Sequence, residues 1–98
     1  MNDVTVVRIY VTEGGGRHEA IFKRLHDVEK MRGVTMFRGI AGFGVSGEVH
    51  GASLLDMSLD LPVVVEFFDT PERVEAVLRS MADLLPAGHV LTFAARIR

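Results

Sequence analysis

Two kinds of apolar pattern alternate along this chain, in an order that few folds accommodate. Runs rich in β-branched residues predict strands, whereas apolar residues three or four positions apart predict helices. Strands are predicted over residues 4–11, 34–41, 61–68 and 90–97, and helices over residues 17–32 and 71–85. The order is therefore βαββαβ. Because crossover connections are right-handed, it predicts an α+β, ferredoxin-like sandwich in which both helices cover one face of an antiparallel sheet.

Local signals place the ends of the two predicted helices. Thr70 and Pro71 are typical of an N-cap and a first helical position, so the second helix is expected to begin there. Lys30 and Arg32 suit the C-terminus of the first helix, and Gly33 is the predicted cap.

The composition limits the class of protein. The 98 residues predict a single domain, 1–98, and 48% hydrophobic residues are enough for a core. A domain this small buries limited surface, which makes oligomerisation a common remedy. A net charge of −2 argues against nucleic-acid binding, and the absence of cysteine excludes disulfides and thiolate sites. No signal-peptide pattern and no apolar run of roughly 20 residues is present, so we expect a cytoplasmic protein that is not embedded in a membrane.

The face of the sheet that the helices leave open is predicted from strand alternation. Its expected members are Val6, Arg8, Tyr10, Met36, Arg38, Val64, Glu66, Thr92 and Arg96. This mixture is too apolar for a solvent-exposed face and too charged for a monomer core. We therefore predict an oligomer interface with Arg–Glu pairing. A solvated face with a few ordinary apolar residues is the alternative.

Glycines gather between the second and third predicted strands. Five of the ten glycines lie between Gly39 and Gly51. Glycine lets backbone approach a ligand closely or lets a loop change shape. The segment 42–58 is also longer than an ordinary connection. Function is therefore expected in this part of the chain.

Several short motifs here resemble those of a known family. They are RGIAGFG at residues 38–44, His50, LDLPVVVE at residues 59–66, and RIYV at residues 8–11. Together they resemble the PII-like family catalogued as domain of unknown function 190. The resemblance implies a ferredoxin-like fold and a homotrimer. PII relatives are regulatory, signal-transducing proteins that sense adenine nucleotides and small metabolites in clefts between subunits. In these relatives, the loop that corresponds to residues 42–58 of this chain docks on a transporter, channel or enzyme.

The chain departs from the PII pattern at two places. Val45-Ser46-Gly47 supplies neither the Gln nor the Lys that follows Gly-Phe-Gly in PII proteins, and Ala87-Gly88-His89 lacks the Lys of their Gly-Asp-Gly-Lys turn. Arg96-Ile97-Arg98 is similar to the Arg-Ile-Arg with which PII proteins hold phosphates. The resemblance therefore implies a small anionic ligand, of which a nucleotide is one candidate, and leaves the identity of any cofactor undetermined.

A ligand site is predicted at the base of the loop, between subunits. Its predicted members are Arg38, Gly39, Gly42, Phe43, Gly44, His50, Arg96 and Arg98. The glycines allow close backbone approach, and Phe43 offers an aromatic surface to a planar group. Arg96 and Arg98 are expected to reach an anion from the end of the last strand, with a site across a subunit boundary as one arrangement. His50 is included because it belongs to the family pattern.

Other readings of the sequence compete with this one. Residues 42–47 spell G-x-G-x-x-G, but no amphipathic helix follows, which argues against a dinucleotide-binding unit. The run 14–16 before Arg17 is interpreted as a turn, with an anion site at the following helix as the alternative.

We predict no metal site and no catalytic residues, because no paired histidine motif or nucleophile elbow is present. A small ferredoxin-like enzyme and a ligand-free structural adaptor remain the alternative functions.

Overall fold

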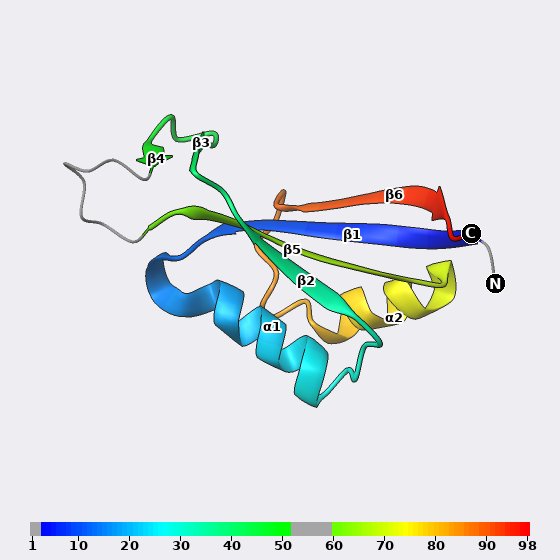
Figure 1. Ribbon diagram of the computed structural model, residues 1–98. Coiled ribbons are helices and arrows are strands. Elements are labelled where there is room, and N and C mark those ends of the chain that lie inside the picture. The colour runs from blue at the N-terminus through cyan, green and yellow to red at the C-terminus, as the bar shows by residue number, and fades with distance from the viewer. Residues whose placement is uncertain (1–2, 52–59) are drawn as a thin grey trace.

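A computed structural model describes residues 3–51 and 60–98. The elements are β1 (Asp3–Thr12), η1 (Gly14–Gly16), α1 (Arg17–Asp27), β2 (Val34–Arg38), β3 (Ala41–Phe43), β4 (Val49–Gly51), β5 (Pro62–Asp69), α2 (Pro71–Ser80) and β6 (Val90–Arg96). Four strands form one antiparallel sheet in the order β2-β5-β1-β6, and both helices lie against the same face of it (Figure 1). The predicted ferredoxin-like sandwich is confirmed. Within the described ranges, no helix is long and apolar enough to cross a bilayer.

The core fills the layer between the sheet and the helices. Alternate residues of the two central strands point into it, and one stripe of each helix packs against them. The side chains with at most 1% of their surface exposed are Val7, Ile9, Ile21, Leu25, Val65, Phe67, Val74, Val77 and Met81. Apolar side chains from β1, β5 and the two helices thus cover this face of the sheet within a single chain.

The first helix ends earlier than predicted. It stops at Asp27, and the chain turns through Lys30, whose φ is 54°. The Met31 N–H bonds to the Leu25 carbonyl oxygen at 3.0 Å, which closes the helix end. A lysine in the left-handed conformation therefore takes the capping place predicted for Gly33.

The second helix begins where the sequence predicted. The Arg73 N–H donates to the Thr70 hydroxyl oxygen at 3.2 Å, and Pro71 occupies the first helical position. Thr70 thereby satisfies one of the free N–H groups at the start of α2.

The predicted open face was correct for the central strands and wrong for the edge strands. Residues opposite one another in register share a face, and Arg8 lies opposite Glu66 on one side and Leu91 on the other. The open face consequently carries Thr35, Phe37, Leu91 and Phe93 in place of Met36, Arg38, Thr92 and Arg96. Both edge strands have apolar residues on both sides, so their alternation does not fix which side faces the helices. The corrected open face is more apolar than the predicted one.

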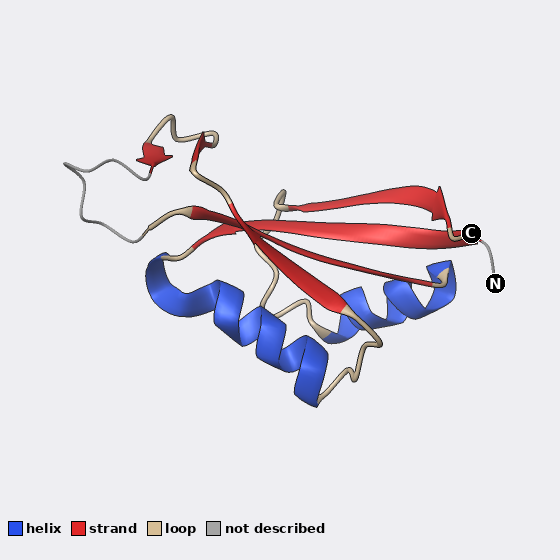
Figure 2. Cartoon of the chain, in the orientation of Figure 1, coloured by secondary structure: helices blue, strands red, loops and turns tan. Residues whose placement is uncertain are grey.

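The strand predicted over 34–41 is interrupted. The chain leaves the main sheet after Arg38, where the Gly39 N–H donates to the Pro62 carbonyl oxygen at 2.7 Å. It then enters a separate two-stranded hairpin of β3 and β4, which projects beyond the sheet (Figure 2). A turn closes the hairpin, with Gly47 at φ 79° and its N–H bonded to the Gly44 carbonyl oxygen at 2.9 Å. Residues 52–58 of the predicted 42–58 segment lie outside the described residues.

Candidate ligand site at the base of the hairpin

Five of the eight predicted site residues line one hollow. It lies where the β3–β4 hairpin leaves the main sheet and has a volume of about 820 Å³. Its predicted members are Arg38, Gly39, Gly42, Phe43 and Gly44. This volume falls in the range of small-molecule sites, roughly 300–1,000 Å³. We refer to it as the hairpin-base hollow.

Residues from three other parts of the chain also line the hairpin-base hollow. Tyr10 comes from the end of β1, Arg17 from the first position of α1, and His89 from the turn before β6. Sequence reasoning did not assign these residues to the site. The run 14–16 and Arg17 were recognised as an alternative anion site, but their position beside the glycine cluster depends on tertiary packing. The hollow therefore gathers Arg17, Arg38 and His89 around glycine backbone.

The three predicted glycines of the hollow differ in how much space surrounds them. A Cβ on Gly39 would lie 2.9 Å from Pro62 Cγ, and one on Gly42 would lie 3.3 Å from the same atom. Both positions therefore leave little room for a side chain, because the backbone there packs against Pro62. A Cβ on Gly44 would meet no atom within 4 Å. Among these three predicted glycines, Gly44 is the one that faces open space, where a ligand has room to approach its backbone.

Arg38 is held by a carboxylate that the sequence analysis did not pair with it. Its Nη2 donates to Glu13 Oε1 at 3.0 Å, whereas Arg8 pairs with Glu66 at 2.7 Å. The hydrogen bond from Arg38 lowers the pKa of Glu13, and the Leu61 N–H adds to this against partial desolvation. The predicted Arg–Glu pairing on the open face is thus made by Arg8 and Glu66, and Arg38 belongs to the hollow.

The histidine of the hollow has a defined orientation. His89 Nδ1 lies 2.8 Å from the Tyr10 carbonyl oxygen, and the Tyr10 N–H donates to the His89 carbonyl oxygen at 2.9 Å. Because a carbonyl oxygen only accepts, Nδ1 carries the proton in this bond. Nε2 is then the ring nitrogen that takes no part in this bond. These two bonds fix the turn, and with it the imidazole, against the end of β1.

Arg96 and Arg98 do not reach the hairpin-base hollow of their own chain. The C-terminus lies at the opposite end of the sheet from the hairpin (Figure 1). There Arg96 Nε lies 3.7 Å from Asp3 Oδ1, with 69% of the Arg96 side chain exposed. His50 belongs to β4 and lies opposite Gly42 in the hairpin register. One chain therefore brings five predicted residues together and leaves the two terminal arginines apart from them.

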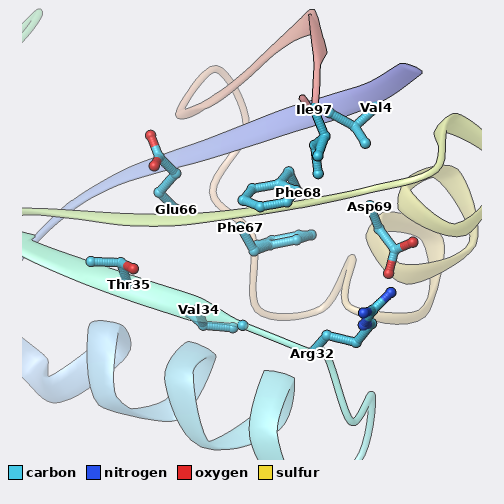
Figure 3. Close-up of a pocket in the computed structure, with 10 residues that line it drawn as sticks. Val4, Arg32, Val34, Thr35, Glu66, Phe67, Phe68, Asp69 and Ile97 are labelled. Carbon is cyan, nitrogen blue, oxygen red and sulfur yellow. The ribbon is translucent and has the colours of Figure 1, made fainter. Parts of the chain in front are cut away.

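A second hollow lies at this far end of the sheet. Its volume is about 490 Å³, and Val4, Phe68 and Ile97 give it apolar walls. Figure 3 shows Arg32 and Asp69 pointing toward one another at one side of it. Thr35 and Glu66 add polar groups. We refer to it as the far-end hollow. Among residues 3–51 and 60–98, no group of three or more His, Asp or Glu residues is placed to hold a metal ion.

Solved structures similar to this one share the whole fold. CPII from Thiomonas intermedia K12, solved bound to ADP and bicarbonate, superposes with a TM-score of 0.64 at 20% sequence identity, covering 97% of this chain and 86% of that one. A second structure is of CPII, a nitrogen regulatory PII-like protein, bound to ADP, AMP and bicarbonate. It gives a TM-score of 0.62 at 17% identity, covering 97% and 92%. The fold is therefore PII-like.

Sequence comparison identifies the family of the chain. The UPF0166 protein of Methanocaldococcus jannaschii is 30% identical over 84 residues, which are 82% of this chain and 77% of that protein. A UPF0166 protein of Aquifex aeolicus is 32% identical over 80 residues, 78% of this chain and 76% of that protein. The model of the family DUF190, described as "Uncharacterized ACR", matches residues 4–97. The chain is thus a member of the DUF190 family, as the motifs around residues 38–44 and 59–66 predicted.

Proposed function

We propose that this protein is a PII-like regulator that binds a small anionic ligand in the hairpin-base hollow and engages a partner protein through the 42–58 segment. The observation that carries this proposal is the convergence of Arg17, Arg38 and His89 with the exposed backbone of Gly44 around one hollow. Guanidinium groups such as those of Arg17 and Arg38, together with backbone N–H groups, are partners that phosphate and carboxylate groups require. The ADP and bicarbonate in the CPII structures are anions of this kind.

The projecting hairpin suits a docking role in the same proposal. Ile40, Phe43 and Val49 expose 82%, 75% and 67% of their surface on and beside it. Apolar side chains gathered on a projecting element are typical of a surface that another protein covers. A membrane transporter or channel is the partner class that the family resemblance favours. Ligand and partner would then act on adjoining parts of one segment.

The open face of the sheet supports assembly of three subunits. Phe37, Phe68, Leu91 and Phe93 each expose between 39% and 52% of their surface there. Arg8 and Glu66 form an ion pair on this face, and the Arg8 guanidinium lies over the Phe93 ring, 5.2 Å from its centroid. An apolar face with a paired charge is suited to burial against further copies of itself. We therefore propose a homotrimer with the open faces turned inward.

In such a trimer, the ligand site is shared between two subunits. The hairpin-base hollow and the terminal arginines lie at opposite ends of one sheet, so no single chain brings them together. A ring of three subunits repeats one head-to-tail contact, in which one end of a subunit meets the other end of its neighbour. We propose that Arg96 and Arg98 approach the hairpin-base hollow of the adjacent subunit. The far-end hollow, lined by Phe68 and Thr35, would then lie beside the same ligand.

Titration calorimetry on the assembled protein tests this function. The probes are ADP, AMP, ATP, bicarbonate and sulfate, and native mass spectrometry reports the subunit count in the same sample. We expect a trimer that binds at least one adenine nucleotide or bicarbonate at micromolar concentration. Gly44→Val should abolish binding without changing the thermal midpoint, because its side chain fills the open space beside the backbone. Binding no better than millimolar for every probe would favour the ligand-free adaptor, and turnover of a probe would favour the enzyme.

A further inference from the structure

We infer that Glu13 is an internal competitor for the anion: its carboxylate occupies Arg38 in the free protein, and a ligand that captures Arg38 loosens the base of the hairpin. This inference rests on the proposed function, since it names how the same site is regulated.

One carboxylate oxygen joins the two strands between which the 42–58 segment is inserted. Glu13 Oε1 accepts from Arg38 Nη2 at 3.0 Å and from the Leu61 N–H at 3.1 Å. Arg38 is the last residue of β2, where the chain leaves the sheet, and Leu61 directly precedes β5, where the chain returns. The Glu13 N–H also donates to the Leu61 carbonyl oxygen at 2.9 Å. Glu13 therefore holds the exit and the return of the segment together.

Two further hydrogen bonds close the same base. The Gly14 N–H donates to Asp60 Oδ1 at 2.6 Å, and the Gly39 N–H donates to the Pro62 carbonyl oxygen at 2.7 Å. Neither bond involves Arg38. Gly14, Gly39 and Pro62 line the hairpin-base hollow as Arg38 does, but the bond between Glu13 and Arg38 is the one in this group that a cationic side chain makes. A change in the hollow therefore reaches the base of the segment through Glu13.

The two partners are exposed to different degrees. The Arg38 side chain is 54% exposed, whereas the Glu13 side chain is 20% exposed. An anion that approaches Arg38 also approaches the Glu13 carboxylate, and like charges repel more strongly where water is partly excluded. The bound anion therefore weakens the bond between Arg38 and Glu13, and it does so more strongly the closer it lies to the Glu13 carboxylate. By thermodynamic reciprocity, a partner that pulls the hairpin base away from Glu13 frees Arg38 and raises the affinity for the anion.

Two isosteric variants separate this role from a general effect of charge. Glu13→Gln keeps an oxygen that accepts from Leu61 and Arg38 but removes the negative charge. Glu19→Gln removes the same charge from a side chain that is 79% exposed, two residues beyond Arg17 of the hollow. Calorimetry with ADP and with bicarbonate is carried out on the wild type and both variants. Hydrogen exchange on the wild type, with and without saturating ADP, follows the amides of Gly39 and Leu61.

We expect Glu13→Gln to bind the anion about fivefold to tenfold more tightly than the wild type, the difference between a charged and a neutral partner for Arg38. Glu19→Gln should stay within about twofold. ADP should accelerate exchange at Leu61 in the wild type. Equal or weaker binding by Glu13→Gln, or slower exchange at Leu61 with ADP, overturns the inference and leaves the proposed function intact. Absence of binding by all three proteins overturns the proposed function and the inference with it.

Discussion

The two faces of the sheet are both apolar, yet only one of them is completed within the chain. On the helix-covered face, side chains such as Ile9 and Phe67 expose at most 1% of their surface. On the open face, Phe68 exposes 49% and Phe93 exposes 39%. The open face therefore leaves apolar side chains accessible that the chain itself does not cover, and the proposed trimer would bury them. The hairpin-base hollow repeats this contrast, because Gly39 packs against Pro62 while Gly44 faces open space.

The largest expected effect lies on the helix-covered face. Ile21→Ala removes a fully buried side chain from the layer between α1 and the sheet. We expect a loss of about 2–5 kcal/mol in the free energy of unfolding, from lost burial and the cavity left behind. Chemical denaturation followed by circular dichroism measures it. A loss below about 1 kcal/mol would show that this face is not the closed core described above.

The ion pair of the open face should matter mainly for assembly. Glu66→Ala leaves Arg8 without the partner whose hydrogen bond raises its pKa above the ordinary value. In a single chain this pair is partly exposed and screened by solvent, so the free energy of unfolding should change little. Burying Arg8 unpaired in the proposed trimer is far more costly, and we expect dissociation of the assembly at micromolar concentration.

Light scattering follows this dissociation, with Glu72→Ala on the exposed start of α2 as the matched control. A monomeric wild type would contradict the proposed assembly. So would a Glu66→Ala variant that assembles as tightly as the Glu72→Ala control.

Two glycines of the hairpin-base hollow should respond differently to the same change. Gly39→Ala places a Cβ 2.9 Å from Pro62 Cγ, and we expect a loss of about 1–3 kcal/mol from overpacking. Gly44→Ala meets no atom within 4 Å, and its effect should stay within about 0.5 kcal/mol. Thermal unfolding of the two variants, measured side by side, provides the test. Equal destabilisation would remove the distinction between a packing glycine and a glycine that faces the ligand.

The smallest expected effect is a dependence on pH. The pKa of Glu13 is lowered by its hydrogen bond from Arg38, so the folded state favours the charged carboxylate. This contribution to stability is present above the ordinary pKa of glutamate and is lost as pH falls through the lower, folded value. Stability should therefore decline on acidification below about pH 4.5.

In Glu13→Gln the decline should be shallower than in the wild type. The bond between His26 and Asp27 lowers the pKa of Asp27 in the same direction, so part of the decline should remain. Denaturation midpoints between pH 3 and pH 7 measure both proteins. Identical slopes would contradict the role assigned to the Glu13–Arg38 bond.

Periodicity predicted the fold because both helices and the central strand β1 show a clear apolar period. The alternation in β1 and the N-cap at Thr70 are local properties, and both were predicted correctly. The faces of β2 and β6 were not, since edge strands with apolar residues on both sides take their register from the neighbouring strand. The prediction for the end of α1 was also wrong, because the left-handed turn falls on Lys30 rather than on a glycine.

The candidate site was predictable only where it is continuous in sequence. Five residues of the 38–44 motif were assigned together, and all five line one hollow, namely Arg38, Gly39, Gly42, Phe43 and Gly44. Tyr10, Arg17 and His89 come from three other segments, and only the packing of β1, α1 and the turn before β6 brings them there. The partner of Arg38 was missed for the same reason, because Glu13 lies in a turn 25 positions earlier in the chain.

Subunit mixing tests the central proposal most directly, namely that an anion site at the hairpin base is completed by the neighbouring subunit. Gly44→Val blocks the hollow, and a double variant of Arg96→Ala and Arg98→Ala removes the cations proposed to reach it from the adjacent chain. Each protein alone should bind ADP and bicarbonate at least tenfold more weakly than the wild type. After equal amounts are unfolded together and reassembled, about one quarter of the sites should regain wild-type affinity, because each site then draws its two halves at random. A mixture that binds no better than its separate components would contradict the shared site.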